Sequence, residues 1–438
     1  MNAQSSISMA GAADVRPKSA VSGGVGACGL VGLALWTMVA RQYGMEGPLA
    51  AMCSVLACGV PMVAWSLIVD KVHRSPSNGI DWDSPPRRLA DSVDISLVKI
   101  VGLWTTWGAI AFLYCVGRWY WDGGYLFAMQ VLAVAAVPML VLSVPYVLWI
   151  DRRLVEPRDG AWQFGRLIIG RGGEFDRELL YDFFRSWTVK GFFIAFMISI
   201  VPGNWADVIR QPWSQILAGP VQLTYWLIAI MFMIDVSFAT VGYALTMKPL
   251  DAHIRSANPY AAGWTAALIC YPPFGLMGNN GPLYYQQGAG DWVYWTDGAP
   301  GIVLAVIGAV LVALTAIYAW ATVAFGIRFS NLTHRGILTH GPYAWTKHPA
   351  YLSKNLFWWI TSLPFLAASG NPVDMVRNTV LLAVVSGIYY WRARTEERHL
   401  GADPAYREYA AWMERNAPLP RLLAKLPRRR APVPAPAE

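Results

Sequence analysis

Two short polar segments near the end of the chain carry the residues best suited to chemistry. The first, residues 341–352, reads GPYAWTKHPAYL, and the second, residues 391–397, reads WRARTEE. Pro349 suits the first position of a helix, where its missing N–H costs nothing, so we expect His348 at the helix cap. The free backbone N–H groups and the positive dipole end at such a cap suit a small anion such as a carboxylate.

The two segments also offer hydrogen-bond acceptors and aromatic faces. Glu396 and Glu397 can accept hydrogen bonds from hydroxyls or from an ammonium. Aromatic residues in and near the segments can stack on a base or hold a cation: Tyr343, Trp345, Tyr351, Tyr406 and Tyr409. A ligand with a carboxylate, an ammonium, ribose hydroxyls and a purine would use all of these groups. S-adenosylmethionine is such a ligand, and other nucleotides fit the pattern loosely.

The paired segments resemble those of the isoprenylcysteine carboxyl methyltransferase family and of its relatives, the membrane phospholipid N-methyltransferases. GPY followed by HPAY at 341–351, RARTEE at 392–397 and YREY at 406–409 carry the resemblance. It covers residues 325–420, and residues 1–320 resemble no family that we can name. HPxY alone is a weak signal, whereas its pairing with RxRxEE at the spacing of a helical hairpin is fairly specific.

The resemblance implies an integral membrane enzyme that uses S-adenosylmethionine to methylate a lipid, isoprenoid or prenylated acceptor. It implies cofactor contacts at Gly341, Pro342, Tyr343, His348, Tyr351, Leu352, Glu396 and Glu397. Arg394 and Arg392 would orient the acceptor or the cofactor carboxylate, which makes them the catalytic candidates. Alignment of donor and acceptor supplies most of the rate enhancement in such a reaction. A carboxylate acceptor needs no general base, whereas an amine or a hydroxyl does.

Other interpretations of the same residues stay open. Sterol reductases with ten spans end in a similar HPxY region and bind a nicotinamide cofactor there, so an NADPH-dependent oxidoreductase is the alternative function. Residues 181–184 (YDFF) faintly resemble one of their segments, but the LNPR that should follow is missing. The tandem glutamates fit the methyltransferases better. Without the paired motif, the charges of residues 391–397 would indicate only an interfacial charge cluster.

The composition indicates a membrane protein. Hydrophobic residues make up 55% of the 438 residues and charged residues 14%, against about 25% charged in a soluble protein. The net charge of +8 is typical of basic cytoplasmic loops rather than of nucleic-acid binding. The five cysteines fall in apolar runs, which argues against a disulfide framework. His334 and His340 have no third ligand at a convincing spacing, so we expect no metal site.

The apolar runs predict an all-α, polytopic bundle of about ten transmembrane helices with both termini in the cytoplasm. The predicted spans are 22–40, 47–69, 95–117, 125–150, 190–202, 221–247, 262–278, 300–326, 350–369 and 376–391. With this orientation the outer loops hold only four basic residues, Arg41, Arg118, Arg210 and Arg377, so the basic residues gather on the inner side. The Ala- and Arg-rich, Lys-poor composition favours a bacterial inner membrane.

The last two spans should fold back on each other at Ser369–Pro372, which brings both polar segments to one cytoplasmic pocket. The predicted domains are a cytoplasmic segment at 1–21, a transmembrane region of about seven spans at 22–299 with a possible interfacial helix at 175–189, a methyltransferase-like region at 300–420, and a disordered basic, Pro-rich tail at 421–438. A carboxylate at Asp235 would cost about 2.5–3.5 kcal/mol if it faced lipid, so we expect it to face the interior. There it either is protonated and forms hydrogen bonds that stabilise the fold, or lines a substrate cavity.

Overall fold

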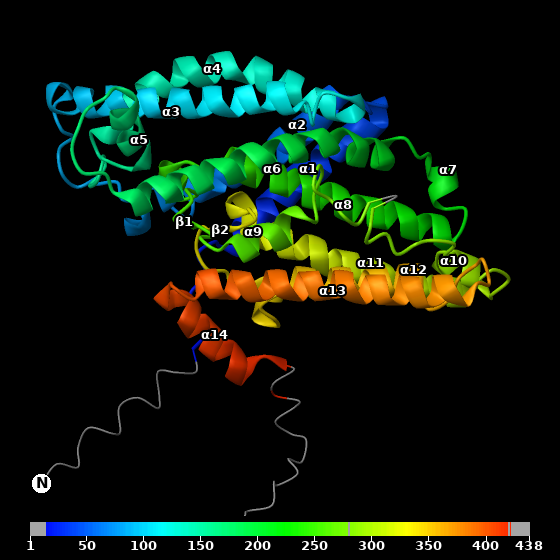
Figure 1. Ribbon diagram of the computed structural model, residues 1–438. Coiled ribbons are helices and arrows are strands. Elements are labelled where there is room, and N and C mark those ends of the chain that lie inside the picture. Colours follow the sequence, from blue (N-terminus) through cyan, green and yellow to red (C-terminus); the bar gives the residue numbers. More distant parts are fainter. Residues whose placement is uncertain (1–14, 279–280, 419–420, 422–438) are drawn as a thin grey trace, which may run out of the picture.

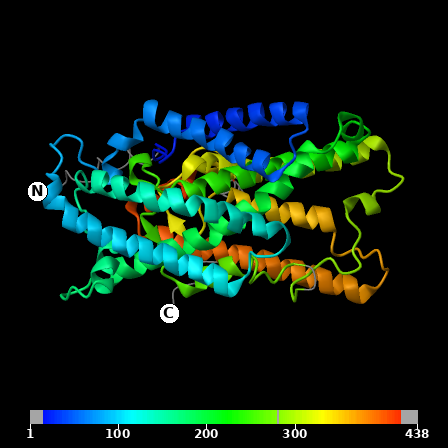
Figure 2. The same ribbon diagram turned by 90° about the horizontal axis from the view of Figure 1, so that it is seen from above.

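The computed structural model describes residues 15–278, 281–418 and 421, and the regular structure in these residues is almost entirely helical. Seven of the described helices are long and apolar enough to cross a membrane. They are α1 (Gly23–Tyr43), α2 (Pro48–Ile68), α3 (Leu89–Gly117), α4 (Leu126–Asp151), α6 (Arg177–Ile209), α8 (Pro220–Ala244) and α11 (Gly301–Phe325). They lie along roughly one axis (Figure 1; Figure 2). The predicted class, a polytopic helical membrane protein, is therefore confirmed. The predicted tail at 421–438 and most of the segment 1–21 lie outside the described residues.

Shorter elements complete the bundle. The helices are α5 (Gly160–Ile168), α7 (Trp213–Ile216), α9 (Ala261–Leu268), α10 (Trp292–Trp295), α12 (Pro349–Ser362), α13 (Pro372–Leu400) and α14 (Pro404–Asn416). The 3₁₀ turns are η1 (Val72–Arg74), η2 (Pro76–Asn78), η3 (Gly123–Tyr125), η4 (Lys248–Leu250), η5 (Gly326–Arg328) and η6 (Gly341–Ala344). Strands β1 (Ser256–Ala257) and β2 (Thr333–His334) pair antiparallel, with Ser256 opposite His334. We call the end of the bundle with this sheet the strand end, and the end with α7, α10 and the α12–α13 turn the far end (Figure 1).

Seven of the ten predicted spans correspond to the long apolar helices, and three do not. Residues 262–278 contain only the eight-residue α9, because the pair Pro272–Pro273 that follows cannot continue a helix. Helix α12 has 14 residues, fewer than the roughly 20 that a span needs. Helix α13 has 29 residues but carries charged residues toward both ends. Of the ten predicted spans, seven therefore have, in the described residues, a helix long and apolar enough to cross a membrane.

Residues 177–209 form one continuous helix, α6. It begins after the N-cap Asp176, whose carboxylate accepts a hydrogen bond from the Leu179 backbone N–H at 3.0 Å. Residues 177–189 of the possible interfacial helix predicted at 175–189 are therefore helical and continuous with the helix that forms the fifth span.

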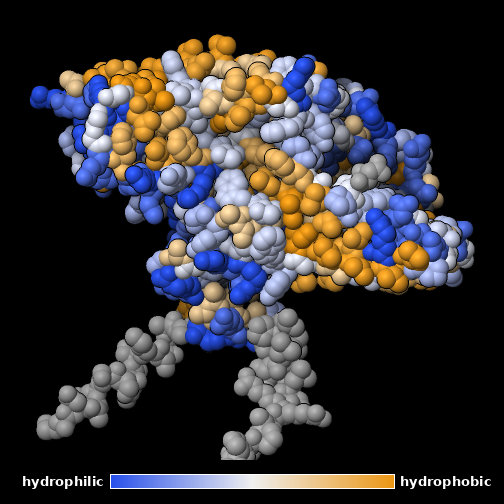
Figure 3. Space-filling view, viewed as in Figure 1, coloured by the Kyte–Doolittle hydropathy of each residue, from blue (hydrophilic) through white to orange (hydrophobic). Residues whose placement is uncertain are grey.

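Helix α8 lies at the centre of the bundle, where it packs against α2, α6 and α11. Every residue from Asp235 to Tyr243 is buried. Helices α3 and α4 lie on the outside and expose large apolar side chains. Figure 3 shows hydrophobic residues over α3 and α4 and along the lower helices, with hydrophilic residues at the strand end. An apolar belt between polar ends is the surface that a bilayer covers.

The chain between β1 and α11 passes from the strand end to the far end with little helix. Near the far end, the Ser369 backbone N–H donates to the Gly288 carbonyl at 3.1 Å, and the Asn378 side chain donates to the Gln287 carbonyl at 2.8 Å. Within the described part of this crossing, only the short α9 and α10 are helical. Irregular backbone at membrane depth needs partners inside the protein, and here the α12–α13 turn supplies one and α13 the other.

A buried ion pair joins α3 to the end of α4. The Lys99 ammonium lies 2.6 Å from Asp151 and 3.0 Å from Asp159, and Ser96 donates to Asp151 at 2.9 Å. The Asp151→Ala variant leaves a buried ammonium short of a partner, so it should lose about 3–5 kcal/mol of stability. We expect a clearly lower melting temperature of the purified protein in detergent, read from tryptophan fluorescence.

The exposed pair between Arg171 and Asp94, at 2.7 Å, is the matched control. Its side chains are 51% and 64% exposed, so the Arg171→Ala variant should change stability by no more than about 1 kcal/mol. Equal melting temperatures for Asp151→Ala and Arg171→Ala would contradict the structural role of the buried pair.

Candidate functional site

The first polar segment forms η6 and the start of α12. His348 is the N-cap of α12 and Pro349 its first helical residue, as the sequence predicts. Gly341 has a φ of 60°, which glycine adopts without strain, and a Cβ there would meet the Trp320 indole nitrogen at 3.2 Å. This tight turn lets the loop pass over the end of α11 before α12 begins.

The two polar segments meet at the strand end, because α12 and α13 form an antiparallel hairpin. His348 Nε2 lies 3.0 Å from Glu397 Oε1, and the Tyr351 hydroxyl donates to Glu396 at 3.0 Å. The His348 and Tyr351 rings stack with an interplanar angle of 7°. The sequence prediction that these distant residues share one site is therefore confirmed in its geometry.

Glu397 is surrounded by basic side chains. Besides His348, it contacts the Lys347 ammonium at 2.8 Å and the Arg394 guanidinium at 2.6 Å. Its side chain is 14% exposed. The hydrogen bond from His348, together with Lys347, lowers the pKa of this carboxyl to about 2. Glu397 is therefore ionised and already engaged, so its main role here is to hold the two segments together.

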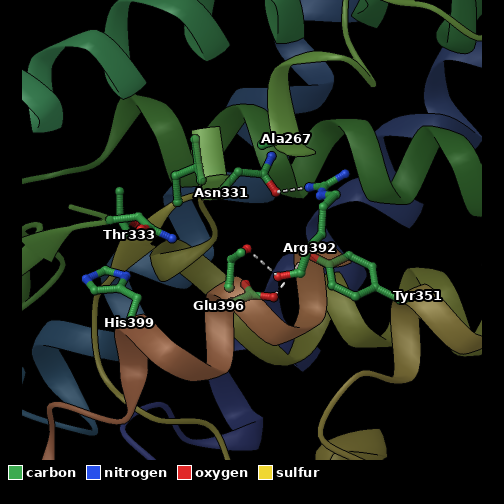
Figure 4. Close-up of a pocket in the computed structure, with 11 residues that line it drawn as sticks. Ala267, Asn331, Thr333, Tyr351, Arg392, Glu396 and His399 are labelled. Atoms are coloured by element: carbon green, nitrogen blue, oxygen red, sulfur yellow. Dashed lines mark hydrogen bonds between the residues drawn. The ribbon is translucent and has the colours of Figure 1, made fainter. Parts of the chain in front are cut away.

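Glu396 has a different environment, although it is the next residue. Its side chain is 36% exposed, and it faces a cavity of about 20 Å³ at the strand end. The cavity is lined by Asn258, Gly263, Ala267, Asn331, Leu332, Thr333, Tyr351, Arg392, Thr395, Glu396 and His399 (Figure 4). A space of this size holds about one water molecule. Because Oε2 of Glu396 accepts the hydrogen bond from Tyr351, Oε1 is the oxygen that Glu396 offers to a group that enters this cavity.

Arg392 is a buried cation in the wall of the cavity. Its side chain points toward Asn331 (Figure 4) and donates to that amide oxygen at 3.2 Å. The guanidinium carbon lies 5.2–5.7 Å from the ring centres of Tyr271, Tyr351 and Tyr389. Arg392 is 6% exposed, and no carboxylate of the described residues pairs with it. An anionic ligand group would therefore find an uncompensated positive charge.

Several residues proposed from the sequence lie outside the cavity wall. Arg394 is 61% exposed and pairs with Glu397. Leu352 is exposed on the outer side of α12. The Tyr343 carbonyl accepts a hydrogen bond from Tyr409 of α14 at 2.7 Å. Gly341 and Pro342 belong to the same turn, so this turn supports the site, and the predicted direct contacts of these residues with a ligand have no counterpart in the cavity.

The sequence analysis missed two groups of lining residues. Thr395 and His399 lie on the same face of α13 as Arg392, at helical spacings of three and seven, and this periodicity was an available signal. Asn258 comes from the segment after β1, which the β1–β2 pairing brings to the site. The sequence carried no signal for that long-range pairing.

His399 forms the floor of the cavity beside Ser256. Its Nε2 lies 3.0 Å from the Ser256 hydroxyl. Burial lowers the pKa of His399 to about 4, so the imidazole is neutral near pH 7 and can donate or accept one hydrogen bond at each nitrogen. The cavity thus combines a cation, a carboxylate, a neutral imidazole and amide groups.

Comparison with protein families places part of the chain in a known group. Residues 282–413 match the model of a family described as a protein of unknown function, DUF1295. The match includes both polar segments and the α12–α13 hairpin. Searches of curated proteins and of solved structures find no match. Residues 282–413 are therefore similar to this family, whose description assigns no activity.

The low pKa of Glu397 predicts how stability depends on pH. Because the folded-state pKa of about 2 lies below the ordinary value of 4.5, the contribution of Glu397 is complete above about pH 4.5 and is lost as pH falls toward 2. The Glu397→Gln variant should melt at a lower temperature than the wild type near pH 7. The difference should shrink as the pH is lowered.

The Glu408→Gln variant is the matched control, since Glu408 lies exposed on α14. Its melting temperature should follow that of the wild type at every pH. A constant difference between Glu397→Gln and the wild type across this pH range would show that the carboxylate does not carry the pH dependence.

Proposed function

We propose that the protein is an S-adenosylmethionine-dependent methyltransferase of the membrane that acts on a lipid, isoprenoid or prenylated acceptor. The observation that carries the proposal is the convergence of Tyr351, Glu396 and Arg392 on one cavity at the strand end. The positive-inside pattern of the loops supports a cytoplasmic location for this end, where the soluble donor is available.

The side chains around the cavity are of the chemical types that would bind the parts of S-adenosylmethionine. Arg392 suits the methionine carboxylate, because its charge has no carboxylate partner among the described residues. Glu396 suits the ribose hydroxyls or the ammonium, and the tyrosine rings suit a sulfonium or an adenine. The cavity of about 20 Å³ admits only one small group. Binding of the whole cofactor therefore requires the segment before α9 to separate from α13.

In this proposal the residues bind and orient rather than react. Bound S-adenosylmethionine supplies an activated methyl group on a sulfonium. Arg392 and Glu396 fix opposite charges of the cofactor, and the resulting alignment with the acceptor supplies most of the rate enhancement. The tyrosines around Arg392 exclude water from the reacting groups.

Glu396 in the cavity lining favours this proposal over a nicotinamide-dependent reductase. A phosphate of NADPH beside Glu396 would be repelled by its carboxylate. The positive sulfonium and ammonium of S-adenosylmethionine would instead be attracted to the Glu396 carboxylate.

Binding of S-adenosylhomocysteine to the purified full-length protein tests the proposal. We expect a saturable rise in melting temperature with this ligand and none with NADPH. The Glu396→Gln variant removes one charged acceptor, so the dissociation constant should increase about tenfold or more, since a hydrogen bond to a charged group contributes about 1.5–3 kcal/mol.

The control for this experiment is again Glu408→Gln, an exposed acid outside the cavity. Its affinity for S-adenosylhomocysteine should equal that of the wild type. Stabilisation by NADPH in place of S-adenosylhomocysteine would favour the reductase, and wild-type affinity in Glu396→Gln would remove Glu396 from the site.

A further inference from the structure

A second polar cluster lies inside the bundle, farther from the strand end than the cavity. Asp235 of α8 is 8% exposed. Its carboxylate accepts hydrogen bonds from the Tyr318 hydroxyl at 2.6 Å and from the Thr322 hydroxyl, both on α11. Asp235 thus faces the interior, as the sequence predicts, and both of its oxygens are already engaged.

Lys354 of α12 approaches the same cluster from the other side. Its ammonium lies 5.1 Å from the ring centre of Tyr318, 5.3 Å from that of Trp358 and 5.9 Å from that of Tyr389. Among the described residues, no side chain or carbonyl forms a hydrogen bond or an ion pair with this ammonium. The residue is partly exposed, which leaves the side chain accessible to a ligand.

Lys354 and Arg392 both lie near one aromatic ring, that of Tyr389. The Arg392 guanidinium is 5.2 Å and the Lys354 ammonium 5.9 Å from the centre of this ring. Aromatic faces offset part of the charge of a cation, but they do not neutralise it. Two adjacent helices therefore present two cations to one place. No carboxylate of the described residues forms an ion pair with either cation, and Asp235 acts on Lys354 only at longer range.

The position of Lys354 makes this arrangement costly without a ligand. The residue is five positions after Pro349, which is about 8 Å along the axis of α12 from its start. A lysine at membrane depth is costly, and such residues usually belong to functional sites. A ligand that brings negative charge to this place would offset the cost.

We propose that Lys354 binds the anionic head group of a membrane-embedded amphiphile, which is the methyl acceptor, while Arg392 holds the donor carboxylate. This inference rests on the proposed function. The head group lies between the donor cavity and Lys354, and the apolar tail extends into the bilayer. Both Lys354 and Arg392 would repel a cationic amine head group, so the acceptor belongs to the acidic amphiphiles and not to the amino lipids.

A series of amphiphiles with one tail and three head groups tests the charge preference. The probes are oleate, oleyl alcohol and oleylamine, added to the purified full-length protein in detergent. We expect a saturable rise in melting temperature with oleate and no such rise with oleyl alcohol or oleylamine. Equal or better stabilisation by oleylamine or oleyl alcohol would overturn the proposal.

Variants of Lys354 locate the site. Lys354→Met keeps the length of the side chain but removes its charge, so the affinity for oleate should fall about tenfold, whereas Lys354→Arg should retain it. The control is Lys190→Met, because the Lys190 ammonium also lies over an indole ring, that of Trp187, at 4.1 Å. Unchanged oleate binding in Lys354→Met, or an equal loss in Lys190→Met, would overturn the site.

Separate measurements keep this inference apart from the proposed function. Lys354→Met should bind S-adenosylhomocysteine with wild-type affinity, because Lys354 does not line the donor cavity. Failure of the wild type to bind S-adenosylhomocysteine would remove the proposed function, while failure to bind oleate with intact donor binding would remove only this inference. If Lys354→Met does not fold, the wild-type amphiphile series still decides the charge preference.

Discussion

The register of the α12–α13 hairpin is the constraint on which the site depends. His348 and Tyr351 reach the paired glutamates of α13 through hydrogen bonds of 3.0 Å each, and Trp359 donates to Ser386 at 3.1 Å farther along the hairpin. A slip of one helical turn, about 5.4 Å, would break all three contacts. The cavity exists because these contacts specify the same alignment of the two helices.

The sequence predicted the place of the site better than the role of each residue. Proline at the first helical position put His348 at the cap, and the hairpin put it beside the glutamates. Glu396 and Glu397 look equivalent in the sequence, but successive residues of a helix point about 100° apart. Glu396 therefore faces the cavity, whereas Glu397 faces three basic groups. Asn258 could not be predicted, because it reaches the site through a sheet between distant segments.

The helical class and seven of the spans follow directly from apolar runs, because length and hydropathy decide them. The other three predicted spans correspond to α9, α12 and α13, which are shorter or more charged than a membrane helix. Tertiary packing replaces lipid as part of their environment. Helix α13 carries charges toward both ends, and its buried Arg392 is accommodated by tyrosines and an amide. Hydropathy also could not show that Asp235 is bonded by hydroxyls of α11.

The irregular crossing between β1 and α11 bears on the order in which the chain assembles. Arg377 and Asn378 of α13 donate to carbonyls of residues 284 and 287, and these donors are synthesised later than the backbone that they satisfy. The crossing cannot enter a bilayer as an independent helix, since its backbone groups would lack partners there. It must wait near the membrane surface until α13 is in place, so the cavity at the strand end is among the last parts of the protein to form.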